Sequence, residues 1–373
     1  MTHRMKILVA MSGGVDSSVA AALLKEQGHD VIGVTMQLWD YSKNEVSCDP
    51  NAKFDTCCSH DDVADARSVA QKLSIPFYVL DYQDDFQTNV VDYFTDEYLR
   101  GRTPNPCVAC NTFLKFDHLL ERALRLGCDA VATGHYARIE HDKYSGHYRL
   151  LKGVDAQKDQ SYFLYSLTQE RLSKILFPLG GMTKTEVRYH AERFELVNAK
   201  KKESMEICFI PNNDYAAFIE KHADKSKIIK GEIKSEDGEC LGSHDGIHKF
   251  TVGQRKGLGI FADRPLYVTR IDPETGTVFV GGEEYLKRKG FYFSNIHLIQ
   301  NEPLEDFVEV KIRYRSAPAL GKVIGFSKSE YGSEVQGVVF NEPQRSITPG
   351  QIAVLYRGDE VLGGGFIDRI AEL

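Results

Sequence analysis

The chain has 373 residues, of which 42% are hydrophobic and 27% charged, a composition typical of a globular protein with two or three domains. Its 46 basic and 53 acidic residues give a net charge of −7, so a nucleic-acid partner would require a local basic patch. The sequence contains no apolar run of about 18 residues, and MTHRMK leads directly into an apolar strand. We therefore expect no membrane span, no signal peptide and a cytoplasmic location, where the eight cysteines would be reduced.

The first predicted turn joins an apolar strand to a helix. MKILVAMSGGVDSS places glycines and serines at this junction. Gly13 and Gly14 allow the main chain to approach an anion closely, and the free amides at the helix start point toward it. Ser12 and Ser17 add hydroxyl donors, and Asp16 is a natural partner for Mg²⁺. The pattern predicts a site for the phosphates of a nucleotide.

The type of phosphate loop follows from what the turn lacks. The sequence contains no GxxxxGK[ST], so this is not the loop of kinases and GTPases. SGGxDS instead resembles the PP-loop of ATP pyrophosphatases, enzymes that adenylylate an oxygen of their substrate and release pyrophosphate. The structural alternative is a glycine turn that only joins a strand to a helix.

Strand and helix patterns alternate through the first half of the chain. Predicted strands are KILVAM, DVIGVTMQL, PFYVLDY and DAVATGHYA, and predicted helices span residues 16–27, 61–73, 84–99 and 112–126. This alternation predicts an α/β fold with a doubly wound parallel sheet. Ligands of such sheets bind beyond the carboxyl ends of the strands. We expect Ser12–Ser17, Met36, the Pro106 loop and Gly134 to line one crevice there.

The pattern changes after Ala137. ARIEH and YRLLKG predict a hairpin, and Thr183 with Glu186 predicts a capping box at the start of the next helix. Short strands and glycine turns dominate from about Ile207, and an all-β tail follows from about Phe291. We place a catalytic α/β domain at residues 1–206, a small central β-rich domain at 207–290 and a C-terminal β-barrel-like domain at 291–373.

Two cysteine-containing segments are candidates for chemistry. Cys107 and Cys110 lie in NPCVACN, an expected loop before a helix, where the helix dipole favours a thiolate. Taken alone, this CxxC fits sulfur transfer, half of a zinc site, a pair of cluster ligands or a redox pair. Cys208 in SMEICFIP has apolar neighbours, which by composition favours a buried core thiol.

A basic stripe is predicted in KIRYRS near the C-terminus. Lys311, Arg313 and Arg315 alternate along an expected strand, so their side chains would project from one face of a sheet. Such a stripe suits an RNA backbone. The alternative is an ordinary solvated strand face.

The ordered combination of motifs identifies a family. SGGVDSS, GRTPNPCVACN, ATGHYA, KDQSYFL, SMEICFIP, TVGQRKGLG and KIRYR occur in this order across almost the whole chain. Together they closely resemble the tRNA-specific 2-thiouridylases of the MnmA/TrmU type. The resemblance implies that ATP adenylylates the 2-carbonyl oxygen of the wobble uridine in tRNAs of the Lys, Glu and Gln type, and that a cysteine persulfide then supplies sulfur. It implies ATP and Mg²⁺ as cofactors, and as partners tRNA and a persulfide donor, either a cysteine desulfurase or a sulfur-relay protein.

The resemblance also implies roles for individual residues. Cys110 would be the nucleophile and Cys208 the persulfide carrier, which overturns the interpretation of Cys208 from composition. Implied ATP contacts are Ala10, Met11, Ser12, Gly13, Gly14, Val15, Asp16, Ser17, Met36 and Gly134. Implied contacts with tRNA or the target base are Asn105, Pro106, Cys107, His135, Lys158, Asp159, Gln160, Arg313, Tyr314 and Gln351.

The chain departs from the family pattern at Cys107, where many members have an aspartate. One interpretation is that the thiol fills the role beside the base or that this role is dispensable. The other is that Cys107, Cys110 and Cys208 hold an iron–sulfur cluster such as [4Fe–4S] with an open iron position.

Two other functions remain open at this point. Another PP-loop ligase acting on a metabolite would use SGGVDSS but would leave the cysteine pair and the β tail without a role. A non-catalytic RNA-binding protein could sense ATP or hold a cluster. The ligase should turn over without RNA, and the sensor should release no pyrophosphate.

Overall fold

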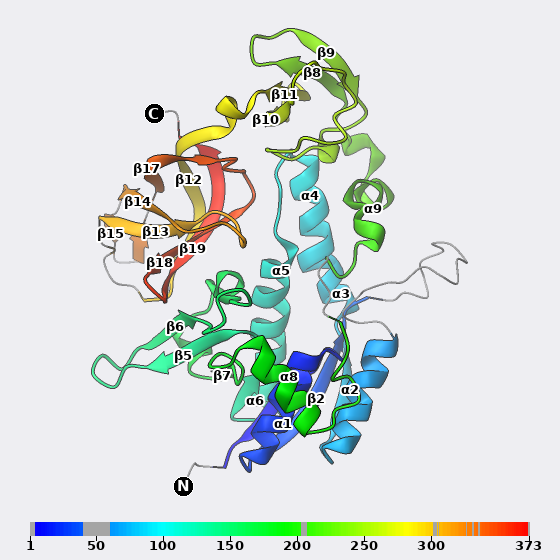
Figure 1. Cartoon of the computed structure of the whole chain (residues 1–373), viewed down its shortest axis with the longest axis vertical. Helices are drawn as coiled ribbons and strands as arrows, with labels where there is room; N and C mark the ends of the chain where they lie inside the picture. The colour runs from blue at the N-terminus through cyan, green and yellow to red at the C-terminus, as the bar shows by residue number, and fades with distance from the viewer. Residues whose placement is uncertain are drawn as a thin grey trace. The chain divides into compact units, whose positions relative to one another are not determined.

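The structure is a computed structural model of the chain, and it describes residues 4–39, 60–202, 207–300, 304, 306–325, 327–329, 332–334 and 336–371 (Figure 1). The described residues form two compact units. The first contains those within Met1–Val90, Cys107–Asn213 and Asp359–Val361, and the second those within Val91–Pro106, Asp214–Gly358 and Leu362–Leu373. In this part of the chain, no helix combines the length and apolarity needed to cross a bilayer.

A five-stranded parallel sheet forms the centre of the first unit (Figure 1). Its strands in spatial order are β3 (Phe77–Asp81), β2 (Asp30–Gln37), β1 (Lys6–Ala10), β4 (Ala130–Ala132) and β7 (Ile175–Leu176). The chain adds β2 and β3 on one side of β1 and β4 and β7 on the other, so the strand order reverses between β1 and β4. This topology confirms the predicted doubly wound α/β sheet, whose ligands bind at such a reversal.

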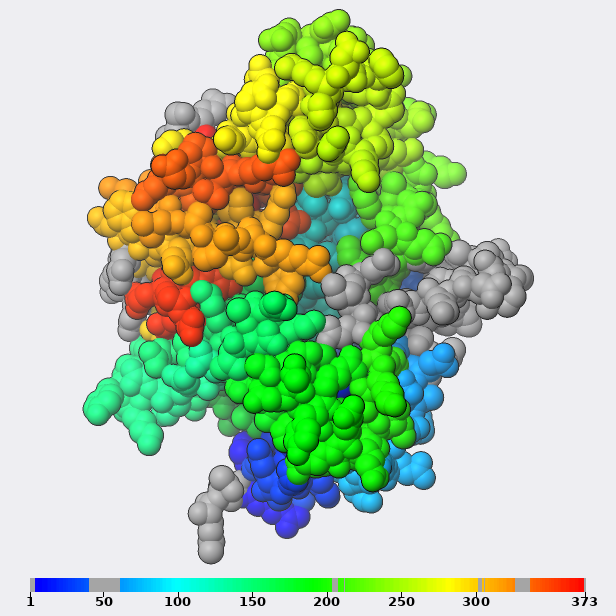
Figure 2. Space-filling view, viewed as in Figure 1, coloured from blue at the N-terminus to red at the C-terminus, as the bar shows by residue number. Residues whose placement is uncertain are grey.

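Three helices share one core with β1. They are α1 (Val15–Glu26), α2 (His60–Lys72) and α8 (Lys184–Arg193). Ile7, Val9 and Met11 project to the same side of the first strand and its exit, and all three are buried among apolar side chains of these helices. In Figure 2 the segment that contains α8 covers much of α1 on the face turned to the viewer. The predicted capping box is confirmed, because Thr183 and Glu186 bond each other's backbone amides at the start of α8.

The helices after β3 differ from the expectation. The predicted helix 84–99 consists of α3 (Gln83–Phe86), a π-helical segment η2 (Gln87–Asp92) and α4 (Tyr93–Leu99). The predicted loop at residues 101–111 is wrong from Pro106 onward. There α5 (Pro106–Ala109), the π-helical η3 (Cys110–His118) and α6 (Leu119–Arg125) follow one another directly. A proline has no N–H that a helix would lose at its first position, so Pro106 can begin this helix.

The first unit also contains a hairpin and three short elements. The elements are β5 (Ala137–His141), β6 (Tyr148–Lys152), η4 (Ser161–Leu164), α7 (Gln169–Leu172) and η5 (Pro211–Asn213). The predicted hairpin is confirmed by the antiparallel pairing of β5 with β6. Its tip carries the fully exposed Tyr144 and protrudes from the unit (Figure 2).

The second unit contains a four-stranded sheet and a barrel. The sheet has the order β10 (Tyr267–Asp272), β11 (Thr277–Gly281), β8 (Gly231–Ser235) and β9 (Cys240–His244). The barrel has the order β12 (Lys287–Leu298), β17 (Gly337–Arg345), β14 (Ala319–Ile324), β13 (Phe307–Lys311), β18 (Ile352–Arg357) and β19 (Glu360–Ile370), and β12 closes it against β19. The remaining elements are α9 (Tyr215–His222), η6 (Lys225–Lys227), η7 (Ile247–Lys249), η8 (Glu283–Leu286), β15 (Ser327–Ser329) and β16 (Gly332–Glu334). Each of the two β structures has its own apolar core, and the predicted β-rich and barrel-like folds are confirmed.

The predicted basic stripe on a strand is wrong. β13 ends at Lys311, and residues 312–316 form a turn, so Lys311, Arg313 and Arg315 do not alternate along one strand face. Arg313 turns inward and donates to the carbonyl oxygen of Ser346 at 2.8 Å and to the Thr348 hydroxyl at 2.9 Å. Ser346 and Thr348 are buried, so this guanidinium serves two buried acceptors and does not project from a sheet face as the alternation of charges predicts.

Gly13 provides a test of the fold. A Cβ built on it would lie 2.2 Å from the carbonyl oxygen of Asp62, at a backbone φ of +73°. Gly28 has φ +87° and open space around it, so an alanine there has the unfavourable backbone conformation but no steric clash. It is therefore a matched control. We expect Gly28→Ala to cost about 1 kcal/mol and Gly13→Ala at least about 2 kcal/mol, because the backbone must also shift.

The measurement is urea unfolding of the full chain followed by the fluorescence of Trp39, the single tryptophan, which lies in the first unit. Equal losses for the two variants would contradict the close approach of Gly13 to α2.

Candidate active site

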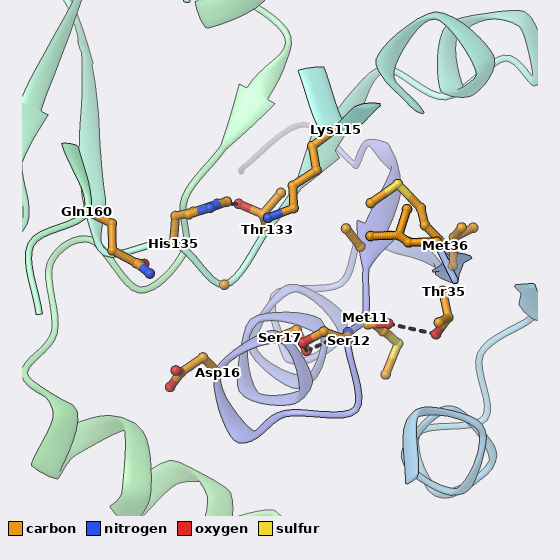
Figure 3. A pocket seen from close by; sticks show the side chains of 14 residues that line it. Met11, Ser12, Asp16, Ser17, Thr35, Met36, Lys115, Thr133, His135 and Gln160 are labelled. Atoms are coloured by element: carbon orange, nitrogen blue, oxygen red, sulfur yellow. Dashed lines mark hydrogen bonds between the residues drawn. The ribbon is translucent and has the colours of Figure 1, made fainter. Parts of the chain in front are cut away.

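A cleft of about 220 Å³ opens beyond the carboxyl ends of β1, β2 and β4, where the strand order reverses (Figure 3). It is lined by Ala10, Met11, Ser12, Asp16, Ser17, Val34, Thr35, Met36, Leu38, Lys115, Thr133, Gly134, His135 and Gln160. Seven of the ten implied ATP contacts are among these residues. The other three, Gly13, Gly14 and Val15, belong to the same turn but do not line the cleft.

The turn before α1 is held by hydrogen bonds within the turn and from the neighbouring strand. The Ser17 hydroxyl accepts the N–H of Ser12 at 3.1 Å and donates to the carbonyl oxygen of Gly14 at 3.3 Å. From the neighbouring strand, the Thr35 hydroxyl donates to the carbonyl oxygen of Met11 at 2.6 Å. The turn is therefore fixed before any ligand arrives, which preorganises its amides.

A second glycine brings another strand end against the start of α1. A Cβ on Gly134 would lie 2.7 Å from the backbone nitrogen of Ser17, so only glycine fits between β4 and the helix. The uncompensated amides in the first turn of α1 consequently face a narrow cleft. This arrangement suits a phosphate chain at a helix amino end.

Asp16 is engaged by two side chains. Its Oδ1 accepts the Lys184 ammonium at 2.7 Å and the Tyr136 hydroxyl at 2.8 Å. Lys184 stands at the start of α8, and only 15% of its side chain is exposed. The turn itself contains no lysine, and α8 supplies one. Lys184 does not line the cleft, but it bonds Asp16, which does.

Asn198, which follows α8 in the chain, also bonds the turn. The buried side-chain amide of Asn198 donates to the carbonyl oxygen of Gly13 and to the Ser18 hydroxyl, both at 2.9 Å. Three residues further on, Lys201 forms ion pairs with Asp62 and Asp65 of α2. The turn, α2 and the segment after α8 are therefore linked by hydrogen bonds.

Lys115 and His135 form the wall opposite the turn. The Lys115 ammonium donates to the side-chain oxygen of Asn111 at 2.8 Å. His135 is buried, and its Nδ1 lies 2.6 Å from the Thr133 hydroxyl. Burial, and then the charge of Lys115, lower the pKa of His135 well below its ordinary value, so the ring is neutral near pH 7. His135 was predicted to contact the target base, and the structure places it in this wall.

The cysteine pair lies within the helix that begins at Pro106. Cys107 is exposed in its first turn, and Cys110, half-buried, begins the π-helical segment η3. The sequence predicted these thiols in a loop before the helix, and the helix start moves them into its first two turns.

Cys208 lies in a segment of the first unit that packs on its neighbours through aromatic rings. The neighbouring Phe209 is buried and contacts Phe86 of α3, with ring centroids 5.4 Å apart, and Trp39 at 6.5 Å. Helix α3 also contacts η3, the segment that Cys110 begins. The two cysteines therefore belong to segments that share α3 as a neighbour.

The predicted iron–sulfur cluster receives no support from this geometry. Among the described residues, which include Cys107, Cys110 and Cys208, no three His, Cys, Asp or Glu side chains form a group that could hold a metal ion. The three thiols thus do not form a ligand set, and we do not propose a cluster.

The predicted tRNA contacts in KDQSYFL have structural partners. The buried carboxylate of Asp159 accepts the N–H groups of Gly153 and Ser161 at 3.0 and 3.1 Å, so this side chain holds its own loop together and does not face solvent. Gln160 lines the cleft and accepts the N–H of Tyr136 at 3.0 Å. Lys158 is half-buried beside them.

Two of the predicted tRNA contacts in the second unit, Gln351 and Arg313, form hydrogen bonds to loops of that unit. The side-chain amide of Gln351 donates to the carbonyl oxygen of Thr103 at 2.9 Å, two residues before Asn105. Arg313 bonds the 346–348 segment as described above, and Tyr314 is half-buried in the turn that follows β13. Arg313 and Gln351 therefore hold loops in place whatever else they contact.

Sequence reasoning missed several residues that build the site. Thr133 follows β4 just before Gly134, so the rule that found Gly134 could have included it. Lys115 occupies an ordinary helical position, and Lys184 and Asn198 lie more than 160 residues from the turn that they hold. The sequence contains no local signal for these three.

Family models match nearly the whole chain. Residues 5–212 match the tRNA methyl transferase HUP domain, 216–282 the tRNA methyl transferase PRC-barrel domain, and 288–367 the aminomethyltransferase beta-barrel domain. The described sheet and barrel agree with these matches.

Similar curated proteins share one name. The chain is 51% identical over 368 residues to tRNA-specific 2-thiouridylase MnmA of Geobacter metallireducens, covering 98% of this chain and 97% of that protein. It is 52% identical to the protein of that name from Geotalea uraniireducens, covering 98% and 96%, and 49% identical to that from Carboxydothermus hydrogenoformans, covering 98% of each. With the PP-loop cleft in its parallel sheet and its C-terminal barrel, the chain belongs to the tRNA-specific 2-thiouridylase (MnmA) family.

Proposed function

We propose that this protein is a tRNA-uridine 2-sulfurtransferase, which uses ATP to replace the 2-oxygen of the wobble uridine with sulfur in tRNAs of the Lys, Glu and Gln type. The observation that carries the proposal is the cleft, in which a glycine turn and helix amides stand at the reversal of a parallel sheet. Family membership supports the substrate class.

The first step is an adenylylation. The 2-carbonyl oxygen of uridine attacks the α-phosphorus of ATP, and the bond to the β-phosphate breaks, so that pyrophosphate leaves with the electron pair. The proton on N3 goes to solvent. A carbonyl oxygen is a poor leaving group, and its ester with AMP is a good one. The amides at the start of α1 and the Ser12 and Ser17 hydroxyls would hold the phosphate chain.

Two thiols complete the second step. The terminal sulfur of a persulfide on Cys208 attacks C2, and AMP leaves with the electron pair of the C–O bond. The Cys110 thiolate then attacks Sγ of Cys208, the sulfur–sulfur bond to the base breaks, and 2-thiouridine and a Cys110–Cys208 disulfide result. A cellular thiol reductant and the persulfide donor, a desulfurase or a relay protein, restore the starting state. The shared neighbour α3 supports a meeting of the two segments.

Mg²⁺ would be held mainly by the nucleotide. Within the described residues, Asp16 is the single carboxylate in the cleft lining, and Lys184 and Tyr136 occupy its Oδ1. Asp16 could thus give the ion one oxygen, with phosphate oxygens and water completing the shell. The ion would neutralise charge on the phosphates.

The cysteine roles can be tested by thiolation in vitro. We expect Cys110→Ser and Cys208→Ser each to reduce wobble 2-thiouridine at least about 100-fold, because neither thiol can be replaced in the sulfur transfer. Cys240→Ser is the control, since Cys240 is an exposed thiol in the second unit. The measurement is mass spectrometry of nucleosides from tRNA incubated with protein, ATP and a persulfide donor. Unchanged thiolation in both variants would rule out the mechanism.

Arg313 and Arg315 separate loop structure from RNA binding. Arg313→Ala should destabilise the 346–348 segment by about 1–3 kcal/mol, because two acceptors lose a charged donor. Arg315 is exposed in the same turn, so Arg315→Ala should leave the loop unchanged and weaken tRNA binding by a phosphate contact. Hydrogen exchange of peptides covering residues 340–357 and salt-dependent tRNA binding check these outcomes. Equal protection of that segment in both variants would contradict the structural role of Arg313.

A further inference from the structure

We propose that Lys115 is a further catalytic residue of this cleft, whose ammonium binds the α-phosphate of the nucleotide at the point where adenylylation takes place. The inference deepens the proposed function and rests on it for the reaction. The binding of the nucleotide itself can be tested without RNA. Neither the family motifs of the sequence nor the turn of the PP-loop contains this residue.

The first observation is the position of the side chain. Lys115 lines the cleft together with Thr133, Gly134 and His135, and Figure 3 shows it entering from the side opposite Ser12, Ser17 and Asp16. Its charge lowers the pKa of the buried His135, which fits an ammonium close to that wall. A nucleotide whose outer phosphates lie on the turn would have Lys115 across the cleft from them.

The second observation is the charge of the surroundings. The ammonium of Lys115 has the neutral side-chain oxygen of Asn111 as its hydrogen-bond partner, at 2.8 Å. The single carboxylate in the described cleft lining, Asp16, bonds Lys184 and Tyr136 instead. Because Asn111 is buried, it holds the lysine in place, and because its amide is neutral, it does not cancel the charge of the lysine. The cleft therefore keeps a positive charge for an anionic ligand.

The third observation links Lys115 to the cysteine. Lys115 follows Cys110 by five residues within the π-helical segment η3. Backbone bonds in such a segment join residues five apart, so these two residues lie near each other on successive turns. The reacting α-phosphate, the base and Cys110 must meet at one place. Lys115 stands on the same helical segment as Cys110 and also lines the cleft.

The chemistry needs a cation at this place. As the 2-oxygen bonds to the α-phosphorus and the bond to the β-phosphate breaks, negative charge is carried by the α-phosphate oxygens and the leaving pyrophosphate. A preorganised ammonium stabilises that charge without accepting or giving a proton. Asn111 supplies the preorganisation.

The test is binding of AMP, ATP and inorganic pyrophosphate to the full chain in the absence of RNA, by titration calorimetry. We expect Lys115→Gln to weaken AMP and ATP about tenfold, because a charge-assisted bond is lost. Pyrophosphate, which lacks the α-phosphate, should bind within about twofold of the original affinity. Lys115→Arg should recover part of the AMP affinity. Lys143→Gln, which removes an exposed charge on the hairpin tip, should change none of the three.

Two results would overturn the proposal: unchanged AMP affinity in Lys115→Gln, or equal losses for AMP and pyrophosphate. A thermal unfolding midpoint close to that of the original chain shows that Lys115→Gln is folded. If it is not, Lys115→Met, which also removes the charge, replaces it in the same comparison. In Lys115→Gln, the single-turnover rate of pyrophosphate release in the presence of tRNA should fall by a larger factor than the apparent affinity for tRNA. If the original chain thiolates no tRNA, the proposed function fails, but the AMP comparison still decides the role of Lys115.

Discussion

The close approach of backbone to backbone at the start of α1 is the constraint on which the site depends. Gly13 lies against the carbonyl of Asp62, and Gly134 lies against the amide of Ser17, with no room for a side chain at either position. These contacts bring α2 and β4 onto the first helical turn, and they leave its unpaired amides at the edge of a narrow cleft. The donors are thus fixed in place by the fold before a nucleotide enters.

The sequence predicts this part of the molecule well because its signals are local. A strand of consecutive apolar residues, two glycines and an apolar helix can be recognised within a few residues of each other. Met36 and Gly134 could be added because they lie at the carboxyl ends of strands of a parallel sheet, which share one edge. The barrel fold was likewise predicted from short strands and turns.

The rest depends on partners that are distant in sequence. Asn198 and Lys184 hold the turn across more than 160 residues, and neither lies in a pattern that differs from an ordinary loop or helix. In KIRYR the alternation of charges mimics a strand face, yet β13 ends at Lys311. The helix at Pro106 begins earlier than expected because proline is well suited to its first position.

Arg313 and Gln351 show why a residue that the resemblance implies as a tRNA contact need not act by direct contact. The guanidinium of Arg313 already donates to the 346–348 segment, and the Gln351 amide donates to the Thr103 carbonyl. Donors used in this way are less available to a phosphate, since a new bond to RNA would take a charged donor from Ser346 and Thr348, or the Gln351 amide from the Thr103 carbonyl. A substitution of such a residue would then act through the position of the loops. An exposed neighbour such as Arg315 can meet the phosphate with no such cost, so the order of these loops and the charge they present are separate contributions to RNA binding.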